Sequence, residues 1–134
     1  MRLSPLSPEA ARQERRERWR RDRNAAQTLR SAFPKVAQLR VDLTFHGTGP
    51  TTPASQSHVL HPPARAFFGF PCPYADCDGH FDLSAIATAA LGGAVHLTEG
   101  ALDCVGLRAR DHASKQTCSL HLDYKITAEF RRDT

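Results

Sequence analysis

The clearest alternation of apolar and polar side chains lies near the end of the chain. Between residues 117 and 130, every second position from 118 to 130 carries an apolar or cysteine side chain. A period of two predicts a β-strand with one face in the core and the other in water. Residues 36–45 predict a second strand of this kind, clean from residue 39 onward, with apolar side chains at Leu39, Val41, Leu43 and Phe45.

The segments between these two strands are shorter and less regular. Residues 65–71 predict a short strand, and residues 94–110 predict another that is broken near Glu99-Gly100 and kinked at Gly106. Residues 46–63 are rich in Pro, Gly, Ser and Thr, which predicts a long loop. Asp82 is expected to cap a helix that ends at Gly92-Gly93 and has one apolar face, formed by Leu83, Ile86, Ala87, Ala90 and Leu91. The prediction is an α+β fold with an antiparallel sheet of about four to five strands and one packed helix.

The N-terminal segment follows a different pattern. Residues 8–33 predict one long helix that stops before Pro34. Its apolar stripe is too thin for a core helix, because only Trp19, Ala26 and Phe33 recur every seven residues, with Leu29 beside them. We therefore expect a helical arm over residues 1–35 and an α+β domain over residues 36–134.

Charge sets the arm apart from the rest of the chain. Residues 1–40 hold 11 Lys and Arg against 4 Asp and Glu, whereas the remaining residues hold 7 against 10. The basic residues of the arm are almost all arginines, which bind phosphate and carboxylate through a planar fork of donors. This favours an arm that docks on nucleic acid or on an acidic protein, through Arg12, Arg15, Arg16, Arg18, Trp19, Arg20 and Arg23. The alternative is a solvated helix with Glu–Arg pairs along its surface.

Four cysteines supply the candidate chemistry. The first residues lack the apolar run of a secretory signal, and no stretch is long and apolar enough to span a membrane, so we expect a cytoplasmic, reducing compartment. In that compartment cysteines more often bind metal than form disulfides. Disulfides or free thiols are the alternative.

The spacing of the cysteines predicts how they meet. Cys72 and Cys77 lie in one tight turn, where Gly79 gives the backbone freedom. Cys104 and Cys118 are expected on neighbouring strands, opposite each other or one step apart. Four thiolates around one ion leave no position for water, which predicts a structural Zn²⁺ site.

Residues 70–81, with the sequence FPCPYADCDGHF, resemble the metal-binding turn, or knuckle, of zinc ribbons and zinc fingers. The resemblance implies metal binding and covers this segment only. A zinc ribbon would have a second C-x-x-C, whereas 13 residues separate Cys104 from Cys118. His80 is the alternative ligand, in a site with three cysteines and one histidine.

The chain carries no motif for a metal-dependent hydrolase, a phosphate-binding loop or a serine nucleophile. We therefore predict a non-enzymatic, zinc-stabilised binding module, a regulator associated with nucleic acid or nucleoprotein through the Arg-rich helix. The alternative is a protein–protein adaptor or homodimeric regulator that uses Trp19, Leu29, Phe33 and the sheet edges. A small metalloenzyme is a third hypothesis, and no small-molecule substrate is evident.

Overall fold

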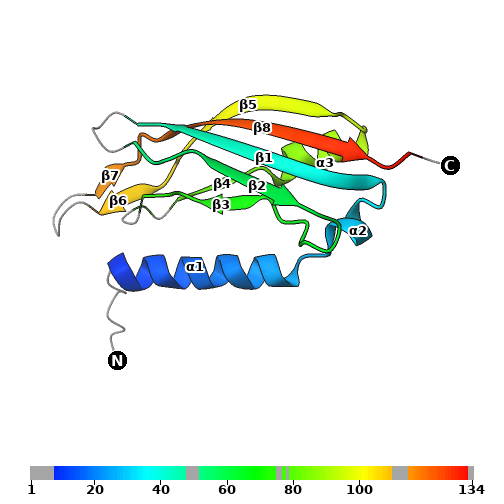
Figure 1. Ribbon diagram of the computed structural model, residues 1–134. Helices are drawn as coiled ribbons and strands as arrows, with labels where there is room; N and C mark the ends of the chain where they lie inside the picture. The colour runs from blue at the N-terminus through cyan, green and yellow to red at the C-terminus, as the bar shows by residue number, and fades with distance from the viewer. Residues whose placement is uncertain (1–7, 48–51, 75–76, 78, 110–114, 133–134) are drawn as a thin grey trace.

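The computed structural model describes residues 8–47, 52–74, 77, 79–109 and 115–132. At residues 8–9, 11–12, 107–109 and 115–117 it describes the backbone alone. A four-stranded antiparallel sheet forms one layer (Figure 1). Its order is β2-β1-β8-β5, with β1 at Val36–His46, β2 at Gln56–Leu60, β5 at Leu97–Asp103 and β8 at His121–Phe130. The α+β fold predicted from the alternation of side chains is confirmed.

The two strands with the cleanest alternation are the two central strands. Their register places apolar residues opposite one another, as in Leu39 with Ala128 and Val41 with Ile126. These side chains are buried, and the alternating polar ones face away from the core. The period-two pattern therefore fixes which face of the sheet is covered.

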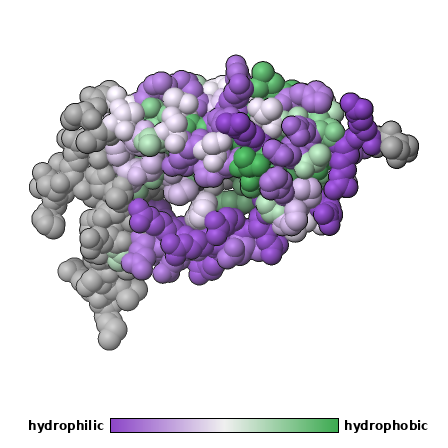
Figure 2. Space-filling view, in the orientation of Figure 1, coloured by the Kyte–Doolittle hydropathy of each residue, from purple (hydrophilic) through white to green (hydrophobic). Residues whose placement is uncertain are grey.

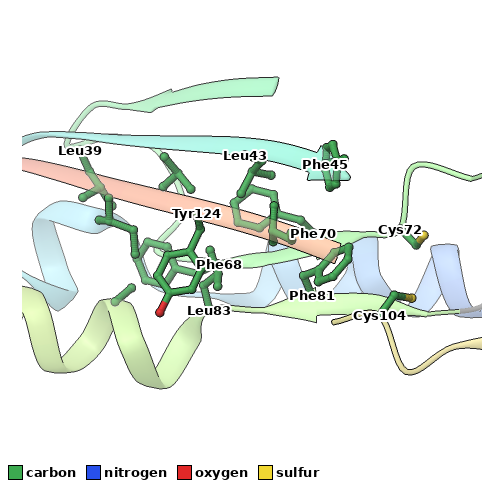
Figure 3. Packing of buried hydrophobic residues seen from close by; sticks show 14 of the residues in the cluster. Leu39, Leu43, Phe45, Phe68, Phe70, Cys72, Phe81, Leu83, Cys104 and Tyr124 are labelled. Atoms are coloured by element: carbon green, nitrogen blue, oxygen red, sulfur yellow. The ribbon is translucent and has the colours of Figure 1, made fainter. Parts of the chain in front are cut away.

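The inner face of the sheet is covered by a second layer. A small hairpin, β3 (Gly69–Pro71) and β4 (His80–Asp82), lies beneath it and leads into α3 (Ser84–Gly92). Figure 3 shows Phe68, Phe70, Phe81 and Leu83 from this layer facing the sheet residues, among them Tyr124. A third sheet pairs β6 (Leu107–Ala109) with β7 (Lys115–Thr117).

The single long helix predicted over residues 8–33 is wrong. The chain forms α1 (Pro8–Ala25) and a separate turn of helix, α2 (Leu29–Ala32). Between them, backbone groups bond to the segment before β3, including Leu29 N–H to Ala64 O at 2.7 Å and Ala66 N–H to Gln27 O at 2.7 Å. Thr28 then caps α2 by accepting the N–H of Ser31.

The break has a consequence for the core. It turns Leu29 into the interior, where its side chain is 0% exposed. Phe33 packs against the same core from the end of α2. Residues on both sides of the boundary predicted at residue 35 thus share one core.

Other boundaries also differ from the prediction. Strand β2 lies inside the segment predicted as a loop. Its mostly polar sequence does not predict a strand, which forms because the segment pairs with β1. The strand predicted at 94–110 is continuous at Gly100, where a break was predicted. It is interrupted at Cys104–Gly106, which includes the position of the predicted kink, and β7 and β8 are separated around Cys118. The strand predicted at 65–71 spans only Gly69–Pro71, and the α3 N-cap is Leu83, although the Asp82 carboxylate accepts the N–H of Ser84.

Helix α1 lies along the β3–β4 hairpin (Figure 1). The indole Nε1–H of Trp19 donates to the Gly69 carbonyl at 2.8 Å, and the Trp19 ring meets Phe67 edge-on at 5.7 Å between centroids. Trp19 is therefore the anchor of α1.

Among the described helices, none combines the length and apolar character that a membrane crossing requires.

Candidate metal centre

The four cysteines come from three separate pieces of the fold. Cys72 follows β3 and Cys77 precedes β4, whereas Cys104 follows β5 and Cys118 lies between β7 and β8. All four are buried, and their sulfur atoms lie within 4.8 Å of one another. Figure 3 shows Cys72 and Cys104 at one end of the core, beyond Phe81. The cluster anticipated from sequence forms, and it can hold a metal ion.

Two similar turns present sulfurs to the centre. Gly79 N–H donates to Cys77 Sγ at 3.3 Å, and Gly106 N–H donates to Cys104 Sγ at 3.4 Å. In each turn the donor lies two residues after the cysteine, so Cys-x-Gly occurs twice in the chain. The first turn was expected from its resemblance to a knuckle, whereas the second was not, and this repeat was the signal that could have revealed it.

Gly79 lies where the two turns meet. A Cβ atom at this position would approach Cys104 Sγ to 2.6 Å and the Gly106 backbone to 2.9 Å. These separations are too short for any side chain. Glycine is therefore required here for close approach rather than for an unusual backbone angle, since no described glycine has positive φ.

The second pair of cysteines is offset further than predicted. Cys104 N–H donates to Leu120 O at 2.9 Å, and Cys118 N–H donates to Gly106 O at 2.9 Å. Cys104 thus lies opposite Leu120, and Cys118 lies opposite Gly106. The two cysteines are offset by two residues along the paired segments, whereas they were predicted to be opposite or one residue apart. The reason is the register of the two segments, which is the same on both sides of the cysteines: Asp103 pairs with His121, and Leu107 pairs with Thr117.

The sulfur separations test the fit of a metal ion. Cys77 and Cys104 have sulfurs 3.6 Å apart, and Cys72 and Cys118 have sulfurs 3.9 Å apart. A tetrahedral ion with thiolates at about 2.3 Å would place its ligands about 3.8 Å apart. A disulfide would need about 2.05 Å between sulfurs, and all four cysteines are free. The donor set therefore fits a tetrahedral, fully sulfur-ligated ion.

The close packing of the four buried thiols shifts the pKa values of three of them. Hydrogen bonding to Cys104 and burial raise the pKa of Cys72 well above its usual range, and burial raises the pKa of Cys77 to about 12. The hydrogen bond from Cys72 lowers the pKa of Cys104 to about 5. Without a cation the cluster thus keeps protons on Cys72 and Cys77, and binding a divalent ion would release them.

The histidines that the structure describes lie outside the cysteine cluster. His80 is exposed on β4 and outside the sulfur cluster, which is the metal-ligating group found among the described residues. His121 bonds to Asp103 at 2.7 Å and to Asp123 at 3.1 Å on the outer face of the sheet. The Asp103 contact, followed by that of Asp123, raises the pKa of His121.

The arginines predicted to bind a partner all lie on α1, whose row of hydrophilic side chains borders the molecule in Figure 2. Trp19, at their centre, points to the hairpin and is half-buried. The side chain of Arg12 lies outside the described part of the structure. The described arginines of α1 are exposed, at positions Arg15, Arg16, Arg18, Arg20, Arg21 and Arg23.

Comparisons with protein-family models, curated proteins and solved structures give no significant match to this chain. The fold and site nevertheless define a class of protein. It is an α+β protein with a buried four-cysteine site that can hold a metal ion. An Arg-rich helix packs on the hairpin that supplies two of the four sulfurs.

Proposed function

We propose that this chain is a non-enzymatic module in which Zn²⁺ fastens the two Cys-x-Gly turns together and helix α1 binds nucleic acid. The observation that carries the proposal is the Trp19–Gly69 hydrogen bond, which holds α1 in place while its arginines stay exposed. A helix that is ordered before binding loses less entropy when a partner arrives.

The donor set supports zinc and a structural role. Four thiolates in a tetrahedral arrangement suit Zn²⁺, because soft sulfur ligands and this geometry favour it over harder ions. Four protein ligands leave no position at which water or substrate could be activated. This supports a module whose metal stabilises the fold and takes no part in a reaction.

The charge of α1 supports an anionic partner. Its six described arginines are twice as many as its three described acidic side chains, Glu14, Glu17 and Asp22. The ion pair between Arg18 and Glu14 is 3.7 Å long and exposed, so it holds Arg18 only weakly. Arginine forks match phosphate oxygens, which favours nucleic acid as the partner.

A matched pair of double variants tests this proposal. Arg20→Gln with Arg21→Gln removes two charges from α1, and Arg131→Gln with Arg132→Gln removes two from the segment after β8. We expect the first to weaken binding of a labelled oligonucleotide, measured by fluorescence anisotropy. The slope of log affinity against log salt should fall by about 0.7 to 0.9 for each phosphate that the variant no longer neutralises. Equal binding by wild type and both variants would rule out α1 as the binding element.

The adaptor or homodimer hypothesis loses part of its predicted surface. Leu29 is fully buried, and Trp19 is occupied by its contacts with Gly69 and Phe67, so neither is available to a partner. Its remaining support is the two sheet edges, where Leu97 of β5 is 51% exposed and Val59 of β2 is 46% exposed. Under that hypothesis Leu97→Lys would convert a dimer into a monomer in light-scattering measurements.

A further inference from the structure

A cavity of about 280 Å³ lies between α1 and the β3–β4 hairpin, beside the cysteine cluster. Arg15, Arg16 and Arg18 border it on the side of the helix. Trp19 and Phe67 form its aromatic wall, and His80 lies on the side of the hairpin. The cavity therefore joins cationic and aromatic side chains in one space.

The arginines are distributed unevenly around the axis of α1. Arg15 and Arg16 precede Trp19 by four and three residues, and Arg23 follows it by four, so they share the helix face that is turned to the hairpin. The guanidinium of Arg23 lies 4.9 Å from the centre of the Trp19 ring. Glu17 precedes Trp19 by two residues, a spacing that places it on the opposite face of the helix. Asp22 follows Trp19 by three residues and shares the face turned to the hairpin, so three arginines against one aspartate give this face a net positive charge.

The aromatic wall is rigid. Trp19 is fixed by its hydrogen bond to Gly69 O, and Phe67 is held against it in an edge-to-face contact. Aromatic rings near arginines are the means by which proteins bind unpaired bases, because every base offers a π-face and every nucleotide a phosphate. Trp19 and Phe67 supply the aromatic rings for the base, and the arginines supply the positive charge for the phosphate.

The size of the cavity limits the ligand. A volume of about 280 Å³ is just below the range of about 300 to 1,000 Å³ found for small-molecule sites. This suits one nucleotide rather than several. A base inside a duplex is paired and stacked, and reaching a cavity would require it to leave the stack at a cost of a few kcal/mol.

We propose that this cavity receives one unpaired nucleotide of a single-stranded nucleic acid, with its phosphate at Arg15 and Arg16 and its base against Phe67. The inference rests on the proposed function and names the part of the nucleic acid that is recognised. Asp22 and Asp82 also line the cavity. Their carboxylates disfavour a phosphate deep inside, which places the phosphate at the arginine rim and leaves the carboxylate oxygens to accept from N–H groups of the base, such as N3–H of thymine.

The chain contains a built-in reporter for this test. Trp19 is its only tryptophan and lines the cavity, so fluorescence excited at a wavelength that tyrosine does not absorb reports on this site alone. We expect a single-stranded oligothymidylate to change the Trp19 emission. A hairpin duplex with the same number of phosphates should bind about tenfold more weakly, within the range expected for the loss of one stacked base, and leave the emission unchanged.

Two variants locate the effect. Phe67→Leu, and Arg15→Gln with Arg16→Gln, should each abolish the preference for the single strand while binding to the duplex continues. Arg20→Gln with Arg21→Gln is the control, because it should weaken binding to both probes alike and leave the preference intact. Metal content and circular dichroism verify that each variant is folded, and the wild-type fluorescence titration stands without any variant.

The outcomes separate the two proposals. If the oligothymidylate binds in anisotropy measurements without changing Trp19 emission, or if both probes bind equally well, the cavity assignment is overturned while nucleic-acid binding stands. If neither probe binds at low salt, the proposed function fails and the cavity assignment fails with it.

Discussion

At the scale of single residues, the geometry of the cysteine cluster depends on glycines as much as on cysteines. With a metal ion bound, the hydrogen bonds from Gly79 and Gly106 to sulfur would stabilise thiolate charge in a buried place. Residue types and spacing were enough to predict the four sulfur donors, because thiols in pairs are rare outside metal sites and disulfides. The close approach of Gly79 to Cys104 was beyond prediction, since it depends on how two distant turns pack.

Gly79→Ala tests this packing. The added methyl group would collide with Cys104 Sγ, so we expect a loss of about 1 to 3 kcal/mol in the free energy of unfolding of the protein. Urea denaturation measures it. Gly92→Ala is the control: it has open space around its Cβ position in α3, and it should be neutral or stabilising by up to about 1 kcal/mol. Equal stability of the Gly79→Ala protein and wild type would contradict the packing described.

At the scale of secondary structure, sequence periodicity predicted elements whose burial is regular. Strands β1 and β8 were predicted because each buries every second residue. Strand β2 and the break between α1 and α2 were not, because both depend on backbone hydrogen bonds to segments distant in sequence. The thin apolar stripe of α1 did indicate a helix outside the core, with Trp19 as its single large contact.

Trp19→Ala tests whether this residue anchors α1. The change removes a hydrogen bond and an aromatic pair, which together amount to about 2 kcal/mol. We expect faster hydrogen exchange at the amides of α1, with β1 and β8 unchanged. Arg21→Ala is an exposed substitution on the same helix and should leave the exchange of α1 as in wild type. Unchanged protection of α1 in the Trp19→Ala protein would show that other contacts hold it.

At the scale of the whole molecule, the cysteine cluster closes one end of the core. It joins the β3–β4 hairpin to the ends of β5 and β8, so one ion would tie the second layer to the sheet. The hairpin in turn carries α1 through Gly69. The arginine helix and the cavity beneath it are thereby positioned relative to the metal centre, which is an arrangement that no local sequence pattern encodes.

The most direct test of this account is the metal content of the full-length protein, purified without added metal. We expect one zinc per chain, with X-ray absorption showing four sulfur ligands at about 2.3 Å. Cys72→Ser and Cys118→Ser should each lose the metal and unfold at lower temperature, whereas His80→Ala should retain both metal and stability. A wild-type protein that is folded but free of metal would contradict the central claim.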